Sequence, residues 1–429
     1  MSGPRLQGHP ADLSLAGRDP AIPGLACLLD DDGLSALLGE PIRVTRVRYK
    51  PHTSTLVAFT RDVEGLDRYG WAMARSPRSR QKLQLRADRS AGAGGGIRFL
   101  HPDPHDDEAV VAVGGLGDDW SLRKNLLWLR QHGQERLALA GFYSALGPGN
   151  GGASVLRYKP ERRLVVRLPS GSGPVILKVA AQPYPEQLGR PLRQRLLRHG
   201  VPVLPELADA RCARHGVSAS PAWGNGDLGA DSSDLAARRA GAALAALHDV
   251  RLEDLRLAGE VPEAAATRAF RDELFATQSM VTVLLPQLED SAVRLAARLL
   301  ARLSQPDGHR PVLAHGDFSP DQVLVDGSGI RIIDFDRLGT AEPAADIGSF
   351  AAAEEVQDSN PAARAAGTPK TWSLMEGYRQ AGGRVSPDRV QLWAAYRLFR
   401  GSVEPFRDRA EDWPADLRWH LRRAQELVA

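Results

Sequence analysis

Three polar side chains have types and a spacing that suit them to act together on one substrate. They are Asp317, Gln322 and Asp334, which lie close together in the sequence. A carboxylate can accept the proton of an attacking hydroxyl, and carboxylate and amide oxygens are hard ligands that suit Mg²⁺. Phosphoryl transfer requires little more from a protein than such a base, a bound metal ion and correct positioning. The three residues therefore indicate phosphoryl transfer, if the fold brings them together.

A β-hairpin is the element that would position these side chains. Two short apolar runs, residues 322–325 and 330–333, flank a turn with the sequence Asp-Gly-Ser-Gly. Apolar runs on either side of a glycine-containing turn are typical of a tight hairpin. Gln322 begins the first run and Asp334 follows the second. A hairpin therefore places both side chains at one end, together with Asp317 of the preceding loop.

The order of these residues resembles the catalytic loop of kinases. Protein kinases use His-Arg-Asp, four residues and Asn, followed by an Asp-Phe-Gly turn whose aspartate binds metal. This chain has His315-Gly316-Asp317, four residues and Gln322, and then Asp334 within Ile-Asp-Phe-Asp. Each triplet alone is explained by an ordinary turn, but the joint order and spacing favour a kinase. Glycine in place of arginine resembles the aminoglycoside phosphotransferase-like family, which also includes choline kinase-type enzymes.

The resemblance implies an ATP:alcohol phosphotransferase that moves the γ-phosphoryl group of ATP to a small-molecule hydroxyl by direct in-line transfer. By this resemblance, Asp317 would take or orient the acceptor hydroxyl, and Gln322 and Asp334 would hold Mg²⁺. His315 would support the loop. Asp346, in Ala-Asp-Ile-Gly, resembles the family's Asp-Leu-Ala element, which implies a structural role in capping a helix and supporting the catalytic loop.

Gln322 departs from the asparagine that most members of the family carry. Its side chain is longer by one methylene, but its carbonyl oxygen can still bind Mg²⁺. Actinobacterial maltokinases and the related glucosamine kinases carry glutamine at this place, so the chain resembles that subgroup. The resemblance leaves an aminoglycoside, an amino sugar and a sugar as candidate acceptors.

A kinase also needs a small lobe that covers the nucleotide. Residues 154–158, 164–168 and 175–180 are three short β-rich runs of the kind that opens such a lobe. Lys178 lies among apolar residues of the third run, at the place of the strand-three lysine that pairs with the α- and β-phosphates. The alternative is an ordinary exposed strand lysine.

The loop between the first two runs carries basic residues and no glycine. Backbone amides of a glycine-rich loop approach phosphates closely, so here Lys159, Arg162 or Arg163 would have to contact the nucleotide through their side chains. A solvated basic loop explains the same residues equally well. Glu186 is the candidate partner of Lys178, unless that ion pair has been lost.

The first part of the chain repeats the opening of this lobe. Residues 43–59 echo residues 152–168, and the Arg-Tyr-Lys-Pro sequence is intact in both. A repeat at a fixed offset predicts a repeated structural unit. The first copy has no lysine at the place of Lys178 and no second His-Gly-Asp. We therefore expect a cap without catalytic residues, as maltokinases carry ahead of their kinase lobes.

Together with these patterns, the family resemblance implies an α+β, bilobal protein-kinase-like fold with an additional N-terminal α+β cap domain. We expect the cap in residues 1–145, the kinase-like N-lobe in residues 146–223, and a helical C-lobe with the catalytic hairpin and acceptor site in residues 224–429. Several acids in residues 336–358 suit an amino sugar's ammonium groups, although a solvated helix end explains them as well. Trp393 and Tyr396 are candidates for a sugar-facing surface, with core packing as the alternative.

Composition limits the other function classes. Of the 429 residues, 43% are hydrophobic and 25% are charged, with no apolar run long enough to cross a membrane and no secretion signal. A net charge of +3 is too small to indicate nucleic-acid binding. We expect a cytoplasmic monomer or homodimer that uses ATP and Mg²⁺. The alternative is a pseudokinase, a nucleotide-binding regulatory module without turnover, which the missing glycine loop favours.

Overall fold

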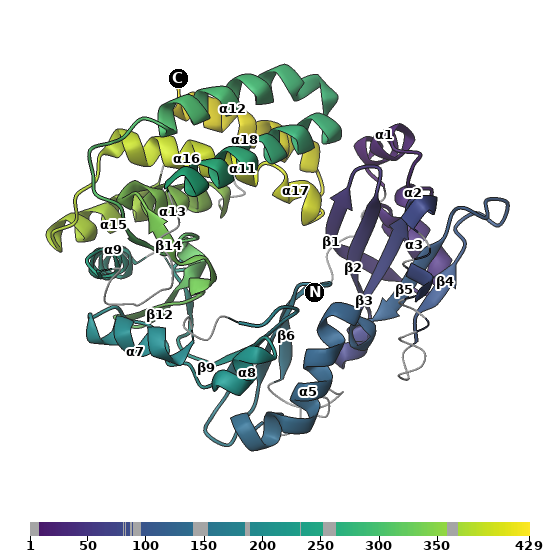
Figure 1. The fold of residues 1–429 in the computed structure, drawn as a ribbon, viewed down its shortest axis with the longest axis horizontal. Helices are drawn as coiled ribbons and strands as arrows, with labels where there is room; N and C mark the ends of the chain where they lie inside the picture. The colour runs from purple at the N-terminus through teal and green to yellow at the C-terminus, as the bar shows by residue number, and fades with distance from the viewer. Residues whose placement is uncertain are drawn as a thin grey trace. The chain divides into compact units, whose positions relative to one another are not determined.

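The structure, a computed structural model, describes residues 8–79, 81, 83–85, 88, 96–139, 153–184, 189–231, 233–251, 263–357 and 368–429. The chain divides into two compact units (Figure 1). The first comprises Met1–Pro185, Leu207–Ala222 and Glu404–Asp416, and the second comprises Glu186–Glu206, Trp223–Val403 and Leu417–Ala429. Both combine helices with β-sheet, which confirms the predicted α+β class.

The first unit contains an antiparallel sheet near its N-terminus that has five strands among the described residues. Their spatial order is β1-β2-β3-β5-β4, and their bounds are β1 (Ile42–Lys50), β2 (Ser54–Arg61), β3 (Tyr69–Arg75), β4 (Arg98–Leu100) and β5 (Val111–Gly115). Strands β2 and β3 are buried along most of their length, which accounts for their continuous apolar sequences. The preceding helices are α1 (Pro10–Arg18), α2 (Leu25–Leu28) and α3 (Asp31–Leu38), and the last two contact the sheet.

A second antiparallel sheet follows in the same unit. Its strands lie in sequence order and are β6 (Ser154–Lys159), β7 (Arg163–Leu168), β8 (Val175–Ala180) and β9 (Val217–Pro221). Burial alternates along β7 and β8, so one face of the sheet covers a core. Helix α5 (Trp120–Leu137) packs on that face, where Asn125 Nδ2 donates to the Ala180 carbonyl at 2.7 Å. The predicted cap, residues 1–145, thus includes a helix that packs on the second sheet.

The two sheets open with hairpins of equivalent register. Each hairpin places the tyrosine of its Arg-Tyr-Lys-Pro sequence opposite the sixth residue after that tyrosine. In the second sheet Lys178 pairs with Val165, and at the equivalent place of the first sheet Met73 pairs with Leu56. The first sheet therefore has a methionine where the second has its candidate phosphate-binding lysine.

A buried aspartate holds the turn of each hairpin in the same way. Asp19 accepts hydrogen bonds from the Tyr49 hydroxyl at 2.6 Å and from the His52 amide at 2.8 Å. Asp119 accepts from the Tyr158 hydroxyl at 3.1 Å and from the Glu161 amide at 2.7 Å. Both turn residues that donate these amides have left-handed backbone, with φ of 57° and 58°. A carboxylate that binds the amide holds the chain in this less favourable conformation.

The segment 404–416 returns from the second unit to the first. Arg409 donates to both carboxylate oxygens of Asp12, at 3.0 and 2.8 Å, and to the Leu29 carbonyl at 2.7 Å. The arginine and the aspartate are both buried. Helix α17 (Glu404–Arg407), in the same segment, contacts β1. A buried, bidentate ion pair of this kind fixes the segment firmly on the first sheet's helices.

The second unit is mainly helical. Its described helices are α7 (Arg190–Arg198), α9 (Asp234–His248), α11 (Glu263–Leu284), α12 (Glu289–Leu303), α13 (Pro343–Gln357), α15 (Pro369–Gln380), α16 (Pro387–Gly401) and most of α18 (Trp413–Leu427). Helices α9 and α15 approach closely at Gly241, where a Cβ atom would lie 1.9 Å from the Leu374 carbonyl oxygen. No described helix is both long and apolar enough to cross a membrane.

Short strands of the second unit flank Asp317, Gln322 and Asp334, the three residues that the sequence predicts to act together. Strands β10 (Gly226–Asp227), β12 (Val323–Asp326) and β13 (Gly329–Ile332) form one sheet, and β11 (Val312–Ala314) pairs with β14 (Gly339–Ala341). An apolar core lies under these strands and includes Phe318, Ile332, Phe335 and Ile347. One side of these strands therefore packs on the apolar core, and the polar side chains lie at the strand ends and in the loops.

Candidate active site

The predicted hairpin is present and brings Gln322 next to the residue before Asp334. Strands β12 and β13 pair with Val323 opposite Ile332. Just beyond that pair, the Ile333 amide donates to the Gln322 carbonyl at 3.0 Å. The two candidate metal ligands thus sit on adjacent chain segments at the open end of the hairpin, as the sequence predicted.

Asp334 has an unusual backbone conformation. Its φ of 64° and ψ of 56° lie in the left-handed region, and it immediately precedes the 3₁₀ turn Phe335–Arg337. Aspartate enters this region more readily than most residues, but a non-glycine residue there is uncommon and often marks a functional site. The conformation turns the chain sharply away from β13, so that the carboxylate lies at a bend beyond the end of the strand.

The His-Gly-Asp loop is held from beneath by one buried carboxylate. Asp346, in the first turn of α13, accepts from the His315 amide at 2.7 Å and from the Gly316 amide at 2.9 Å. The buried His315 ring donates from Nε2 to the Ile333 carbonyl at 2.8 Å, so the loop is also tied to the hairpin. These bonds connect the segment that carries Asp317 to the segment that carries Asp334.

Glycine between the histidine and the aspartate has a structural cause. Gly316 has a φ of 81°, and a Cβ atom on it would lie 2.2 Å from the carbonyl oxygen of Arg337. A side chain at this position would meet both a backbone clash and an unfavourable conformation. The residue that distinguishes this loop from that of protein kinases is therefore dictated by the close passage of the following segment.

Asp346 belongs to a longer buried network that the sequence did not predict. His248 Nε2 lies 3.1 Å from an Asp346 oxygen, and His248 Nδ1 lies 2.8 Å from the Tyr378 hydroxyl. Burial raises the pKa of the Asp346 carboxyl, but hydrogen bonds and the nearby histidines outweigh burial and hold its pKa below the usual value. Asp346 therefore supports the loop as a carboxylate, and His248 of α9 orients it.

Replacing Asp346 by alanine is expected to lower the free energy of unfolding by about 3–5 kcal/mol, because two loop amides and His248 lose a buried charged partner. Urea unfolding followed by circular dichroism measures this loss. The matched control is Asp388→Ala, which removes an exposed carboxylate from the first turn of α16; it should cost no more than about 1 kcal/mol. Equal losses in the two variants would contradict the role of Asp346 in supporting the His-Gly-Asp loop.

The same carboxylate predicts an acid dependence of stability. Its pKa in the folded state lies below the reference value of 3.8, so its stabilising effect is complete above that pH and is lost as pH falls through the lowered folded-state pKa. Asp346→Asn removes the titrating group. We expect unfolding curves of this variant to depend less on pH below about pH 4 than those of the unchanged protein, and identical slopes would contradict the prediction.

Asp317 lies between two arginines. Arg397 of α16 donates to Asp317 Oδ1, and Arg337 Nε lies 3.8 Å from Asp317 Oδ2. Burial raises the pKa of the Asp317 carboxyl, but the two guanidinium groups outweigh burial and lower it. The side chain is 42% exposed. Asp317 is therefore an accessible, ionised carboxylate whose orientation is set by its neighbours.

Sequence reasoning missed Arg397, although a signal for it was present. Trp393 and Tyr396 had been singled out on the same stretch of helix, and Arg397 follows Trp393 by four residues. Residues four apart lie on one face of a helix, so the face that carries Trp393 also carries Arg397. In the structure the Trp393 and Tyr396 rings lie 5.4 Å apart, and the Phe270 ring lies 4.8 Å from that of Tyr396.

The acids after Asp334 mostly have partners within the protein. Glu342 accepts from Arg389 and from Trp393 Nε1, the latter at 2.8 Å. Glu354 is buried and accepts from the amide and hydroxyl of Thr371 at the start of α15. Glu355 is bound by Arg423. Asp358 lies outside the described residues. These contacts give structural roles to the three glutamates, for which the sequence also allowed binding of ammonium groups.

The candidate nucleotide-binding residues lie in the first unit. Lys159 pairs with Arg163, which pairs with Ala180, and Lys178 lies two residues before Ala180. Since side chains alternate along strands, Lys159, Arg163 and Lys178 share the face of the sheet opposite its core. Lys178 Nζ lies 5.7 Å from the Tyr184 ring centre. Glu186, the candidate partner of Lys178, lies outside the described residues.

The donor set at the hairpin fits a magnesium ion that is completed by nucleotide phosphates. No group of three or more His, Cys, Asp or Glu side chains suited to a metal occurs in the described part of the chain. Mg²⁺ in phosphoryl-transfer enzymes is usually held by one or two protein oxygens plus phosphate and water. One carboxylate, Asp334, and one amide, Gln322, at the end of one hairpin match that requirement.

Comparison with known proteins places this site in a family. Residues 145–399, more than half of the chain, match the model of the phosphotransferase enzyme family APH. The chain belongs to this family. It is thus a phosphotransferase of the kinase type, and the family-level resemblance read from the His-Gly-Asp loop is confirmed. The matched region includes Lys178, Asp317, Gln322 and Asp334.

Solved structures of several kinases are similar to this phosphotransferase. A choline/ethanolamine kinase family protein from Mesorhizobium loti is 19% identical, covers 69% of this chain and 94% of its own, and has a TM-score of 0.46. The amicoumacin kinase hAmiN, solved with AMP-PNP and Ca²⁺, is 16% identical, with coverages of 70% and 92% and a TM-score of 0.48. Aminoglycoside phosphotransferase APH(4)-Ia, solved with ADP and hygromycin B, is 15% identical, with coverages of 65% and 93% and a TM-score of 0.48. No curated protein sequence matches the chain.

Proposed function

We propose that this phosphotransferase moves the γ-phosphoryl group of ATP to a hydroxyl of a sugar, amino sugar or aminoglycoside. The observation that carries the proposal is the tie between loop and hairpin. His315 is bound both to Asp346 and to the Ile333 carbonyl, so the candidate base Asp317 and the candidate metal ligand Asp334 are set by one hydrogen-bonded unit. Such preorganisation is the main contribution of a protein to phosphoryl transfer.

Each residue has a defined part in this proposal. The Gln322 amide oxygen and the Asp334 carboxylate would hold Mg²⁺, which supplies charge neutralisation at the phosphate oxygens. Asp317 would accept the hydrogen bond of the acceptor hydroxyl and receive its proton as the oxygen attacks the γ-phosphorus. Lys178 and Arg163, which share one face of the second sheet, would bind nucleotide phosphates through their side chains, in place of a glycine-rich loop.

Asp317 is suited to orient the hydroxyl more than to remove its proton early. Its two arginine neighbours lower its pKa, which makes the carboxylate a weak base but keeps it ionised at neutral pH. In a loose transition state the hydroxyl loses its proton late, so a well-placed weak base is sufficient. Arg397 would release or share Asp317 Oδ1 when the acceptor enters.

Two features support a sugar acceptor of the maltokinase and glucosamine kinase type. Glutamine stands at the place of the usual metal-binding asparagine, and an additional sheet, β1 to β5, precedes the kinase region. The internal partners of Glu342, Glu354 and Glu355 remove three candidate binders of an ammonium group. These three glutamates thus give an amino sugar no advantage over a neutral sugar.

A screen of acceptors tests the proposal. Formation of ADP is followed by a coupled assay with MgATP and a panel of maltose, glucosamine, aminoglycosides, macrolides and choline-like alcohols, and GTP is tried as a second donor. We expect one acceptor class to increase the rate well above that without acceptor. MgATP that raises the melting temperature without any acceptor-dependent turnover would instead support the nucleotide-binding regulatory module.

Arg397→Gln is expected to shift the acid limb of the kcat/KM profile to higher pH, because loss of the guanidinium raises the pKa of Asp317. We also expect kcat to fall by about tenfold or more at neutral pH, because the carboxylate loses its orientation. Arg397→Lys retains the charge and is the matched variant; its acid limb should stay near the original position. An unchanged pH profile in Arg397→Gln would contradict a catalytic role for Asp317.

A further inference from the structure

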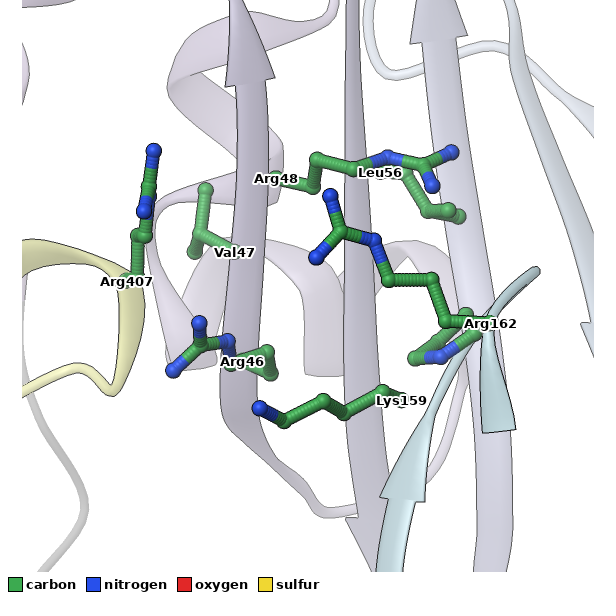
Figure 2. Close-up of a pocket in the computed structure, with 8 residues that line it drawn as sticks. Arg46, Val47, Arg48, Leu56, Lys159, Arg162 and Arg407 are labelled. Atoms are coloured by element: carbon green, nitrogen blue, oxygen red, sulfur yellow. The ribbon is translucent and has the colours of Figure 1, made fainter. Parts of the chain in front are cut away.

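A pocket in the first unit is lined mainly by basic side chains. It lies where β1, the β6–β7 turn and α17 meet, and Figure 2 shows Arg46 and Arg48 on one strand, with Arg407 on one side and Lys159 and Arg162 on the other. Val47, Leu56 and Pro160 complete the lining. None of the described residues that line the pocket is acidic, so a ligand that enters it meets predominantly positive charge.

The cations of this basic pocket are only partly neutralised. Arg46 is paired with Glu404 at 2.7 Å and with Asp408, Arg407 is paired with Glu404 at 2.6 Å, and Arg48 is paired with Glu161. Three of the five basic side chains are therefore paired, with three carboxylates in all. Among the described residues, Lys159 and Arg162 have no carboxylate partner within ion-pair distance.

Burial and neighbouring positive charges make the charged forms of Lys159 and Arg162 less favourable. Burial, followed by the charges of Arg157, Arg46 and Arg163, lowers the pKa of Lys159 to about 8, although Glu404 acts in the opposite direction. Burial and nearby arginines also lower the pKa of Arg162. Like charges kept together in a partly buried place are stabilised by a bound anion, which supplies the missing hydrogen-bond acceptors.

The space available suits a phosphate group with a small organic part. The basic pocket encloses about 50 Å³, several times what a single water needs. An adjoining cavity of about 210 Å³ shares Arg46 and Lys159 with it, and its lining adds the hydroxyls of Thr45, Thr60 and Tyr69. Hydroxyl-bearing side chains next to the cations offer hydrogen bonds to a polyol.

We propose that the basic pocket binds the phosphate group of a small phosphate monoester, such as a sugar phosphate, and that the adjoining cavity receives its organic part. The ligand would bridge β1 of the first sheet, the β6–β7 turn and α17. Lys159 was expected to contact nucleotide phosphates, and in the structure it lines this pocket together with three basic residues from outside the second sheet, Arg46, Arg48 and Arg407. The nucleotide's own phosphates are thus the competing source of the same chemical group.

Isothermal titration calorimetry of the full chain without nucleotide tests the site, with inorganic phosphate and glucose 6-phosphate as probes. We expect glucose 6-phosphate to bind more tightly than phosphate. Arg162→Gln removes an unpaired cation without breaking an ion pair and should weaken both probes about tenfold to a hundredfold. Arg167→Gln, the same change at an exposed position of β7 outside both cavities, is the matched control and should leave binding unchanged.

Three results would overturn the proposal: no measurable heat with either probe, equal binding by Arg162→Gln and Arg167→Gln, or displacement of glucose 6-phosphate by saturating MgATP, which would assign the pocket to the nucleotide. Retained binding of glucose 6-phosphate in the presence of MgATP supports a separate site. Calorimetry requires no turnover, so failure of the proposed kinase activity would leave this test valid.

The pH dependence of binding gives a second readout. A phosphate monoester is almost fully dianionic above pH 7, so a change in affinity between about pH 7 and pH 9 reports on the protein. Lys159, which faces Arg46, Arg157, Arg163 and Glu404, loses its charge in this range because its pKa is about 8. We expect affinity for glucose 6-phosphate to fall over this range, and an affinity that does not change would contradict a role for Lys159.

Discussion

Asp317→Asn is expected to lower kcat by about 10²–10⁴-fold, the usual contribution of a positioned general base, with little change in the affinity for MgATP. The amide keeps the shape of the side chain but cannot receive the acceptor's proton. It also loses the charge that Arg397 and Arg337 hold in place. Steady-state kinetics with a saturating acceptor, together with calorimetric titration of MgATP, measure the two effects separately.

Asp326→Asn is the matched control for this substitution. Asp326 is an exposed carboxylate in the turn of the same hairpin and accepts from the Asn225 side chain at 3.0 Å. An asparagine there can still accept that bond through its carbonyl oxygen. We expect activity close to that of the unchanged enzyme. Full activity in Asp317→Asn, or an equal loss in both variants, would remove Asp317 from the mechanism.

Asp334→Asn is expected to lower kcat by about a thousandfold, because several kcal/mol of transition-state stabilisation depend on the metal ion that Asp334 would hold. The carboxylate supplies the negative charge of the proposed protein ligand pair, and an amide binds Mg²⁺ far more weakly. Activity measured against Mg²⁺ concentration should show a large rise in the concentration needed for half-maximal rate. A proportional loss at all Mg²⁺ concentrations would point to misfolding of the bend.

Gln322 provides a graded comparison for the metal site. Gln322→Asn keeps an amide oxygen but shortens its reach, whereas Gln322→Ala removes the ligand. We expect the asparagine variant to retain more activity and a lower Mg²⁺ requirement than the alanine variant. Asp336→Asn, a change at the exposed carboxylate two residues after Asp334, controls for local charge. If both glutamine variants behaved like the unchanged enzyme, Gln322 would not be a metal ligand.

Much of this site was predictable because it is local in sequence. The apolar runs and the glycine turn define the β12–β13 hairpin, and its register follows from the short turn. Because the hairpin register is set, the sequence spacing of Asp317, Gln322 and Asp334 predicts that all three lie at one end of the hairpin. Asp346 lies on the next helix, so its link to the loop was also within reach of family resemblance.

Contacts between distant segments were less predictable, because the spacing from Trp393 indicates the helix face of Arg397 but does not name its partner. Arg397 is eighty residues from Asp317, and His248 is even further from Asp346. Their side chains give no local periodicity that names a partner. The basic pocket is similar, since Arg46 and Arg407 meet only because the segment 404–416 returns to β1. The apolar spacing of α5 likewise predicts a helix but does not say which sheet the helix packs on.

Phosphorus NMR of a reaction mixture tests the central claim most directly. The enzyme is incubated with MgATP and the acceptor selected by the screen, and the fate of the γ-phosphorus is followed. The account predicts that its signal is replaced by that of a phosphate monoester of the acceptor, with one ADP formed for each ester, and that Asp317→Asn forms almost none. Release of inorganic phosphate alone, or bound MgATP that remains intact with every acceptor, would contradict it.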